Sequence, residues 1–189
     1  MKKRLFIHRF IGHFKTITKH KIIVTGLCFK CGLIKQGLLH DLSKYSPIEF
    51  FSGVKYYQGF RSPINAERED LGYSLGWLHH QGRNKHHWEY WVDKDYNNQE
   101  LYVLHIPLNY IIEGTLDRIA AGKVYNKEYN NTCPYNFLMK GKDRYFIGKD
   151  NLRRYKKLLK YLYDNGEEKA LTYYKELYDS YKKDHKFDI

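Results

Sequence analysis

Residues 38–49 read LLHDLSKYSPIE and contain the polar pair around which the chain is organised. His40 and Asp41 are adjacent, and Leu38, Leu39 and Leu42 surround them in a stretch with a helical pattern. An imidazole and a carboxylate that are buried among leucines must be paired or bound to a cation, because uncompensated burial of charge is costly. We therefore expect a metal ion or an ion pair here, and the alternative is a surface turn of helix with an ordinary His and Asp.

The end of this stretch predicts the start of a second helix. Ser46 can cap it, Pro47 suits the first helical position, and Glu49 lies three residues after Ser46, as in a capping box. The His40–Asp41 pair therefore lies near a helix end. Lys44 follows His40 by four residues, so we expect it on the same helical face, where it could reach an anion or a water.

A helix before this stretch supplies further histidines. Residues 10–31 have helical spacing of apolar side chains and end at Gly32, a natural C-cap. His13 and His20 are seven residues apart and share nearly one face, so either could point at the same site. We expect His8 and His13 to be solvated members of a basic amphipathic helix.

The segment WLHHQGRNKHHWEYW, residues 77–91, is the second dense feature. It contains four histidines, at positions 79, 80, 86 and 87, and imidazole is the commonest ligand of transition metals in proteins. One member of each pair needs to face inward. Its alternative is a basic aromatic loop on the surface, in contact with RNA or DNA.

The apolar segment LNYIIEGTLDRIAAGK, residues 108–123, carries two acids on one face. Glu113 and Asp117 are separated by four residues, and Ile112 and Leu116 mark the neighbouring core side. Asp117 is the candidate fourth ligand. Alternatively, it is an exposed acid paired with Arg118 or a nearby lysine.

The remaining pattern predicts an all-α fold. We expect helices over residues 46–60 and 63–82, then a long connection over residues 126–149 that could act as a lid. Short strand-like or helical pieces are expected within this connection. Residues 150–163 and 167–184 predict a helical hairpin joined at Asn165–Gly166. The chain is expected to form a single domain, with residues 1–125 as the metal-binding core and residues 126–189 as the connection and the hairpin packed on it.

Composition narrows the class of partner. The 33 Lys and Arg against 21 Asp and Glu give a formal net charge of +12, which favours phosphates, nucleotides or nucleic acid. Cys28, Cys31 and Cys133 form no disulfide framework, so we expect a reduced, cytoplasmic protein. No apolar run approaches the roughly 20 residues of a spanning helix, so no membrane partner is expected.

The order of these residues resembles a known superfamily. An H…HD…D order with extra histidines before the last Asp is similar to the HD-domain metal-dependent phosphohydrolases, which have an all-helical core. More closely, LLHDLSKYSPIEF and NKHHWEYW look like a small HD-like family known mainly as a domain of unknown function. The resemblance covers residues 19–123.

The resemblance implies a ligand set and a reaction. Asp41 would bridge one or two divalent transition metals (Fe, Mn, Co, Ni or Zn), and a metal-activated water would hydrolyse a phosphomonoester or phosphodiester such as a nucleotide-like molecule. Asp41 and Lys44 would be the catalytic residues. Among members of this architecture, di-iron oxygenases are one alternative, and a non-catalytic nucleic-acid-binding protein with a structural metal is another. The implied ligands of the first metal are His20, His40, Asp41 and Asp117. Those of the second metal are His80 and His86, assisted by His87. The candidates for phosphate binding flank these ligands and are Lys44, Arg83, Asn84 and Lys85.

Overall fold

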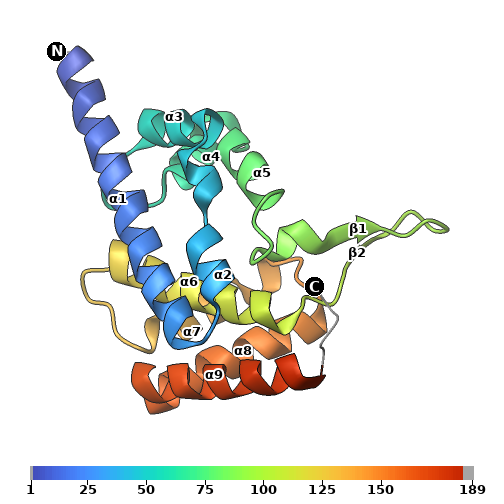
Figure 1. The fold of residues 1–189 in the computed structure, drawn as a ribbon. Coiled ribbons are helices and arrows are strands. Elements are labelled where there is room, and N and C mark those ends of the chain that lie inside the picture. The colour runs from blue at the N-terminus through green and yellow to red at the C-terminus, as the bar shows by residue number, and fades with distance from the viewer. Residues whose placement is uncertain (1, 185–189) are drawn as a thin grey trace.

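The computed structural model describes residues 2–184 of the 189, and the described chain is almost entirely helical (Figure 1). The all-α prediction is confirmed. The helices, with their bounds, are α1 (Lys2–Lys30), α2 (Ile34–Leu39), η1 (Leu42–Tyr45), α3 (Pro47–Tyr56), α4 (Pro63–Leu71), α5 (Leu75–Gln81), η2 (Trp88–Trp91), α6 (Leu108–Tyr125), α7 (Cys133–Gly141), η3 (Lys142–Arg144), α8 (Lys149–Asn165) and α9 (Glu167–Asp184).

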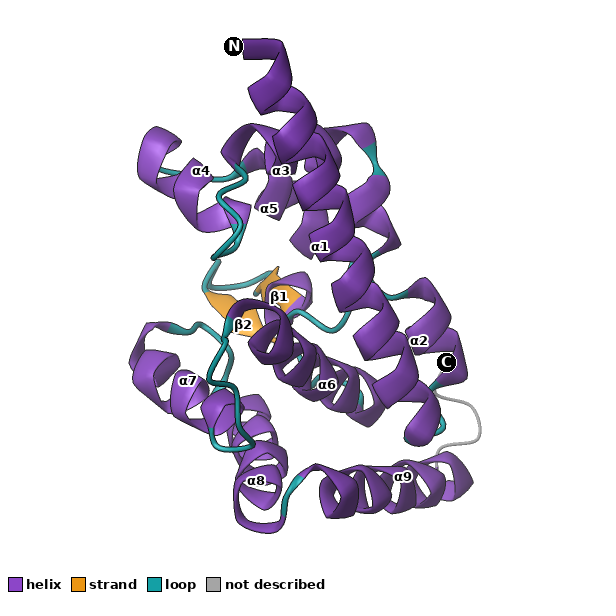
Figure 2. Ribbon diagram, turned by 90° about the vertical axis from the view of Figure 1, so that its left-hand side faces the viewer, coloured by secondary structure: helices purple, strands orange, loops and turns teal. Residues whose placement is uncertain are grey.

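Helix α1 runs the length of the molecule and joins two groups of helices (Figures 1 and 2). Helices α3, α4 and α5 gather near its N-terminal half, and α6 to α9 lie at its other end. The first group packs on α1 through a small cluster of Ile17, Phe50 and Val54. The second group shares the main core with the C-terminal half of α1, which contributes Val24, Leu27 and Cys28 among others.

The C-terminal hairpin packs into that main core. Helix α8 buries Tyr155, Leu158, Leu159 and Leu162, which recur every three or four residues, while Lys156, Lys157 and Lys160 between them are exposed. The helix ends at Asn165 because Gly166 combines φ of 81° with an extended ψ of 171°, a conformation that is essentially restricted to glycine, and its N–H donates to the Leu162 carbonyl. The predicted hairpin junction at Asn165–Gly166 is therefore confirmed.

Several predicted boundaries are wrong. The helix expected over residues 10–31 begins at Lys2. The single helix expected over residues 63–82 is two helices, because Gly72 has φ of 80° and ends α4, and Ser74 then caps α5 by accepting the Trp77 N–H. The connection over residues 126–149 contains the short helices α7 and η3, which agrees with the helical pieces expected there.

A β-hairpin that the pattern did not predict projects from the helical body (Figure 1). Strand β1 (Val92–Lys94) pairs antiparallel with β2 (Leu101–Val103), with Val92 opposite Val103. The two strands are too short to show an alternating pattern in the sequence.

Candidate metal centre

The turn that holds His40 and Asp41 differs from the expected helix. Helix α2 ends at Leu39, and Asp41 takes a left-handed backbone with φ of 54° before η1 begins. Both polar side chains are 2% exposed, whereas Leu38, Leu39 and Leu42 are 47–55% exposed. The polar pair is therefore buried as expected, but the leucines around it face outward.

The cap predicted at the next helix is also wrong. Pro47 is the first residue of α3, but the Ser46 hydroxyl makes no capping hydrogen bond. Glu49 does not turn back to Ser46, because its carboxylate bonds the Nδ1 atoms of His79 and His80, at 2.6 and 2.8 Å.

Three side chains, from α1, the turn after α2 and α6, gather around Oδ2 of Asp41. His20 comes from α1 and Asp117 from α6. Asp41 Oδ2 lies 3.6 Å from His20 Nε2 and 3.3 Å from His40 Nε2, and Asp117 Oδ1 lies 2.9 and 3.5 Å from the same two nitrogens. Together they form a first subsite: His20, His40, Asp41 and Asp117.

The other carboxylate oxygen of Asp41 faces a second cluster. Asp41 Oδ1 lies 3.3 Å from His80 Nε2 and 3.5 Å from His86 Nε2. The Nε2 atoms of His80 and His87 are 2.9 Å apart. These residues form a second subsite, and Asp41 belongs to both: Asp41, His80, His86 and His87.

The spacing of these atoms fits bound cations. Two ligand atoms on one ion with bonds of about 2.1 Å lie about 3.0–3.4 Å apart in octahedral or tetrahedral geometry. The observed separations, 2.9–3.6 Å, bracket that range. The inward nitrogens of His40 and His86 and Oδ1 of Asp41 are buried without a hydrogen bond among the described residues, which is unfavourable unless a cation satisfies them. Asp41 Oδ2 already pairs with the Lys44 ammonium.

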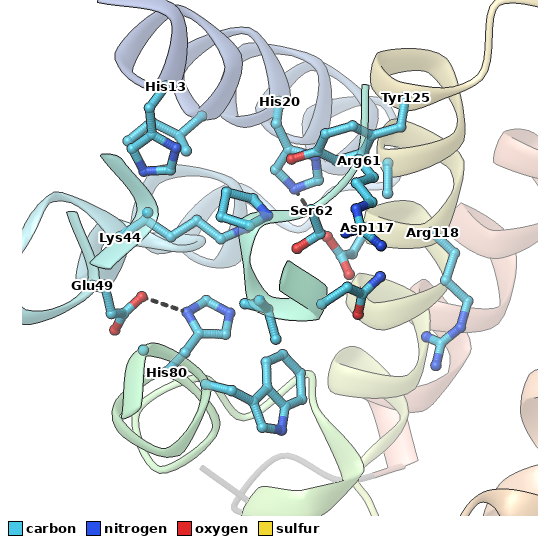
Figure 3. Close-up of a pocket in the computed structure, with 18 of the residues that line it drawn as sticks. His13, His20, Lys44, Glu49, Arg61, Ser62, His80, Asp117, Arg118 and Tyr125 are labelled. Carbon is cyan, nitrogen blue, oxygen red and sulfur yellow. Dashed lines mark hydrogen bonds and ion pairs between the residues drawn. The ribbon is translucent and has the colours of Figure 1, made fainter. Parts of the chain in front are cut away.

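Two glutamates outside the subsites orient the imidazoles. Glu113 Oε1 lies 2.9 Å from His40 Nδ1 and 3.2 Å from His86 Nδ1, so it accepts a hydrogen bond from one histidine of each subsite. Glu49 accepts from His80 Nδ1 (Figure 3). Each of these bonds fixes the proton on Nδ1 and leaves the Nε2 lone pair directed at the subsite.

The acids and imidazoles of the cluster differ in charge state. Burial would raise the pKa of Asp41, but the charges of His40, Lys44 and His80 hold it well below its usual range, so the carboxylate is ionised. Burial lowers the pKa of His20 and His87, so both imidazoles are neutral, the form that binds metals. The Asp41 carboxylate outweighs burial at His40 and His80 and raises the pKa of both, so a cation would displace a proton from each of these two imidazoles.

The two subsites lie on the wall of a cavity of about 520 Å³. His20, Lys44, His80 and Asp117 point into it from different elements (Figure 3). Helix α7 and the segment between α3 and α4 also line it, with Phe137 and Phe60 among their residues. The centre is thus reachable by a small molecule.

Lys44 lies at the centre, and the other flanking candidates do not. Its Nζ is 2.5 Å from Asp41 Oδ2, and its side chain is 26% exposed on the cavity. Asn84 is buried and supports the site from behind, because its Nδ2 donates to the His80 carbonyl and the Ser43 hydroxyl. Arg83 and Lys85 are exposed and are not among the residues that line the cavity.

His13 differs from its expected solvated position. It is 5% exposed, lines the cavity and packs between Phe50 and Tyr57. Burial lowers its pKa to about 4, so it is neutral. His79, in turn, bonds Glu49 and lies outside both subsites.

The sequence pattern missed several residues of the site. Glu113 was noticed only as a neighbour of Asp117, although its position four residues before Asp117 on the same helix places it toward the same cluster. Arg61, Arg118 and Tyr125 line the cavity, and no spacing in the sequence connects them with the histidines.

Fold and site together define an all-helical protein in which buried His and Asp clusters could bind metal at the wall of a cavity. The chain belongs to the family of unknown function DUF5662, whose model matches residues 9–161. All residues of both subsites fall within the matched segment. Comparison with curated proteins and with solved structures finds no match.

Proposed function

We propose that the chain is an HD-like metal-dependent phosphohydrolase that acts on a small phosphate ester, such as a nucleotide. One observation carries the proposal: the two oxygens of Asp41 face two separate imidazole clusters on the wall of one cavity. Two divalent cations at such a site supply a water of lowered pKa and polarise a phosphoryl oxygen. The donors are imidazoles and carboxylates without thiolate, a set that suits Fe, Mn, Co, Ni or Zn.

The residues of this chain would bind the cations and set the net charge of the site. Asp41 and Asp117 provide the negative charge that keeps cations in place, and Glu113 and Glu49 keep the imidazoles oriented. Asp41 raises the pKa of Lys44 against the effect of burial, so the ammonium stays charged beside the centre. From there Lys44 would bind a phosphate oxygen.

The test is elemental analysis of protein purified without added metal, followed by a phosphate-release screen with varied divalent ions. Asp41→Asn keeps the shape of the side chain but removes its charge, and it is expected to lose bound metal and phosphate release together. Asp93→Asn on β1, an exposed position away from the cavity, is the matched control and should keep both. Metal-free wild-type protein, or phosphate release that survives in Asp41→Asn, would refute the proposal.

The same donor set also favours a second candidate, a di-iron oxygenase, because a carboxylate that joins two histidine-rich subsites suits a pair of iron ions. Oxygen uptake by iron-loaded protein, without phosphate release, is the result that distinguishes it. Bound metal without turnover, combined with salt-sensitive binding of nucleic acid, would instead indicate the basic binding protein with a structural metal.

A further inference from the structure

The N-terminal part of the molecule exposes an unusual amount of apolar surface. About half of the large hydrophobic side chains that are exposed in the described residues belong to the segment 5–51. Contiguous apolar surface on a protein commonly marks an interaction site. Its clearest component is on α1, which also contributes His20 to the metal centre on another side.

Helix α1 carries a stripe of exposed apolar side chains, which is interrupted by Thr18 and Thr25, whose hydroxyls bond Tyr45 and the Gly37 carbonyl. At 100° per residue, the stripe positions fall within an arc of about 80°. Ile22 is 66% exposed, and α2 packs beside the stripe at Phe29 and adds the exposed Ile34 and Leu38. We define the α1 stripe as Ile7, Ile11, Phe14, Ile22 and Phe29.

The charge around the stripe has a single sign. Residues 1–40 contain nine Lys and Arg and no Asp or Glu, so the first acid of the chain is Asp41. Lys15, Lys19, Lys30 and Lys35 are exposed on α1 and α2. The apolar stripe is therefore flanked by cations without any compensating acid.

We infer that the α1 stripe binds the surface of an anionic phospholipid bilayer, with α1 lying in the interface. A basic amphipathic helix buries its apolar side chains at the acyl boundary while its lysines contact lipid phosphates and carboxylates. A second copy of this chain fits the stripe less well, because it would bring two acid-free basic faces together. Nucleic acid would satisfy the lysines but would leave the isoleucines and phenylalanines exposed to water.

The position of the stripe leaves the cavity open. His13, Ile17 and His20 face the cavity, and they lie about 130° around α1 from the middle of the stripe. The N-terminal turns of α1 project beyond α3, where a flat surface can reach them (Figures 1 and 2). Among the described residues no helix is long and apolar enough to cross a bilayer, so the expected contact is with its surface. This inference replaces the expectation of no membrane partner, and it does not depend on the proposed hydrolase activity.

The test is co-sedimentation of the full chain with vesicles of phosphatidylcholine, with or without about one-third phosphatidylserine. Wild-type protein is expected to bind the phosphatidylserine vesicles at least about tenfold more strongly, and added salt should weaken the binding. Ile11→Asp/Ile22→Asp and Lys15→Glu/Lys19→Glu should each reduce the binding by about tenfold or more. Leu101→Asp, which changes a 61% exposed leucine on β2, is the matched control and should bind as wild type does.

Three results would overturn the inference. The first is equal binding of the wild-type protein to both kinds of vesicle, and the second is unchanged vesicle binding by both double variants. The third is a wild-type dimer that Ile22→Asp dissociates, with no vesicle binding by either the wild-type protein or this variant. Helicity by circular dichroism and metal content by elemental analysis should be unchanged in the variants, because the altered side chains are exposed and lie away from the subsites. Loss of vesicle binding with retained metal separates this inference from the proposed function.

Discussion

Asp41 combines an uncommon backbone with a central chemical position. A non-glycine residue at φ of 54° is disfavoured for most side chains, but Asp and Asn tolerate this conformation better than others do. The left-handed turn separates α2 from η1 and directs the carboxylate inward while the leucines on either side face outward. Backbone strain of this kind clusters at functional sites.

Glu113 and Glu49 give a paired test of how the two subsites are built. Because Glu113 Oε1 accepts from both His40 and His86, Glu113→Gln is expected to weaken metal binding at both subsites by about 10–100-fold. Glu49→Gln touches only His80 among the ligands, so only the second subsite should weaken. Metal titration by calorimetry measures the number of sites and the affinity of each. Equal effects of the two variants on both sites would contradict this arrangement.

The residues of the site were predictable to the extent that they share a simple spacing. His20, His40–Asp41 and the 79–87 segment stand out as polar groups in apolar or histidine-dense contexts, and the structure brings them together. The expectation for His13 failed because seven-residue spacing gives a face but not the depth to which it is buried. The spacing from Ser46 predicts that Glu49 belongs to a capping box, but its carboxylate bonds His80 instead. A local pattern cannot show this bond, because the two residues are 31 positions apart.

The cysteines allow a further prediction at this scale. Cys28 and Cys31 are fully buried, and burial raises the pKa of both thiols, that of Cys31 to about 12. Since the thiolate is the reactive form, neither should react with iodoacetamide at pH 8 in the folded protein, whereas the partly exposed Cys133 should. Mass spectrometry of alkylated peptides, before and after denaturation, measures this. Rapid native labelling of Cys28 or Cys31 would show that the main core opens.

At the scale of elements, α1 and α3 approach closely at a glycine. A Cβ atom at Gly53 would lie 2.2 Å from Nε2 of His13, whose ring is held between Phe50 and Tyr57. Gly53→Ala should therefore destabilise the protein by about 1–3 kcal/mol, because the helices must separate or the ring must move. Gly26→Ala is the control in α1, where the added methyl meets nothing within 4 Å, and it should stabilise by about 0.5–1 kcal/mol. Urea unfolding measures both changes, and a neutral or stabilising Gly53→Ala would contradict the packing.

The elements found from the sequence are those whose burial follows the helical period. Helices α1, α8 and α9 bury residues spaced by three and four, whereas α6 buries every residue from Ile111 to Leu116. The sequence predicts all four helices. The sequence predicts one helix over the region of α4 and α5, because Leu71, Leu75 and Leu78 continue an apolar stripe at helical spacing. All three leucines are exposed, by 39–54%, and Gly72 divides the segment. An apolar period predicted the helices but not which face is buried.

For the whole molecule, the site depends on the assembly of helices that are distant in sequence. The first subsite needs α1, the turn after α2, and α6, whereas the second needs α5 and the segment before η2. Tyr155 of α8 fixes that segment to the core by donating its hydroxyl proton to the His86 carbonyl, at 3.0 Å. The C-terminal hairpin therefore supports a metal-site residue, although it contributes no ligand atom to either subsite.

Removal of metal should consequently destabilise the entire fold. The ligand atoms that lack hydrogen bonds come from the turn after α2 and the segment before η2, so a cation that satisfies them binds the folded chain and not the unfolded one. Binding at a free metal concentration of 100 times Kd stabilises the folded state by about 2.7 kcal/mol. Calorimetric unfolding of metal-loaded protein should show a Tm that falls by several degrees after treatment with a chelator and recovers when metal is restored. In Asp41→Asn the chelator should have no effect on Tm, because that variant lacks the carboxylate charge shared by the two subsites. A wild-type Tm that the chelator leaves unchanged would mean that the converging side chains are satisfied by one another and not by a cation.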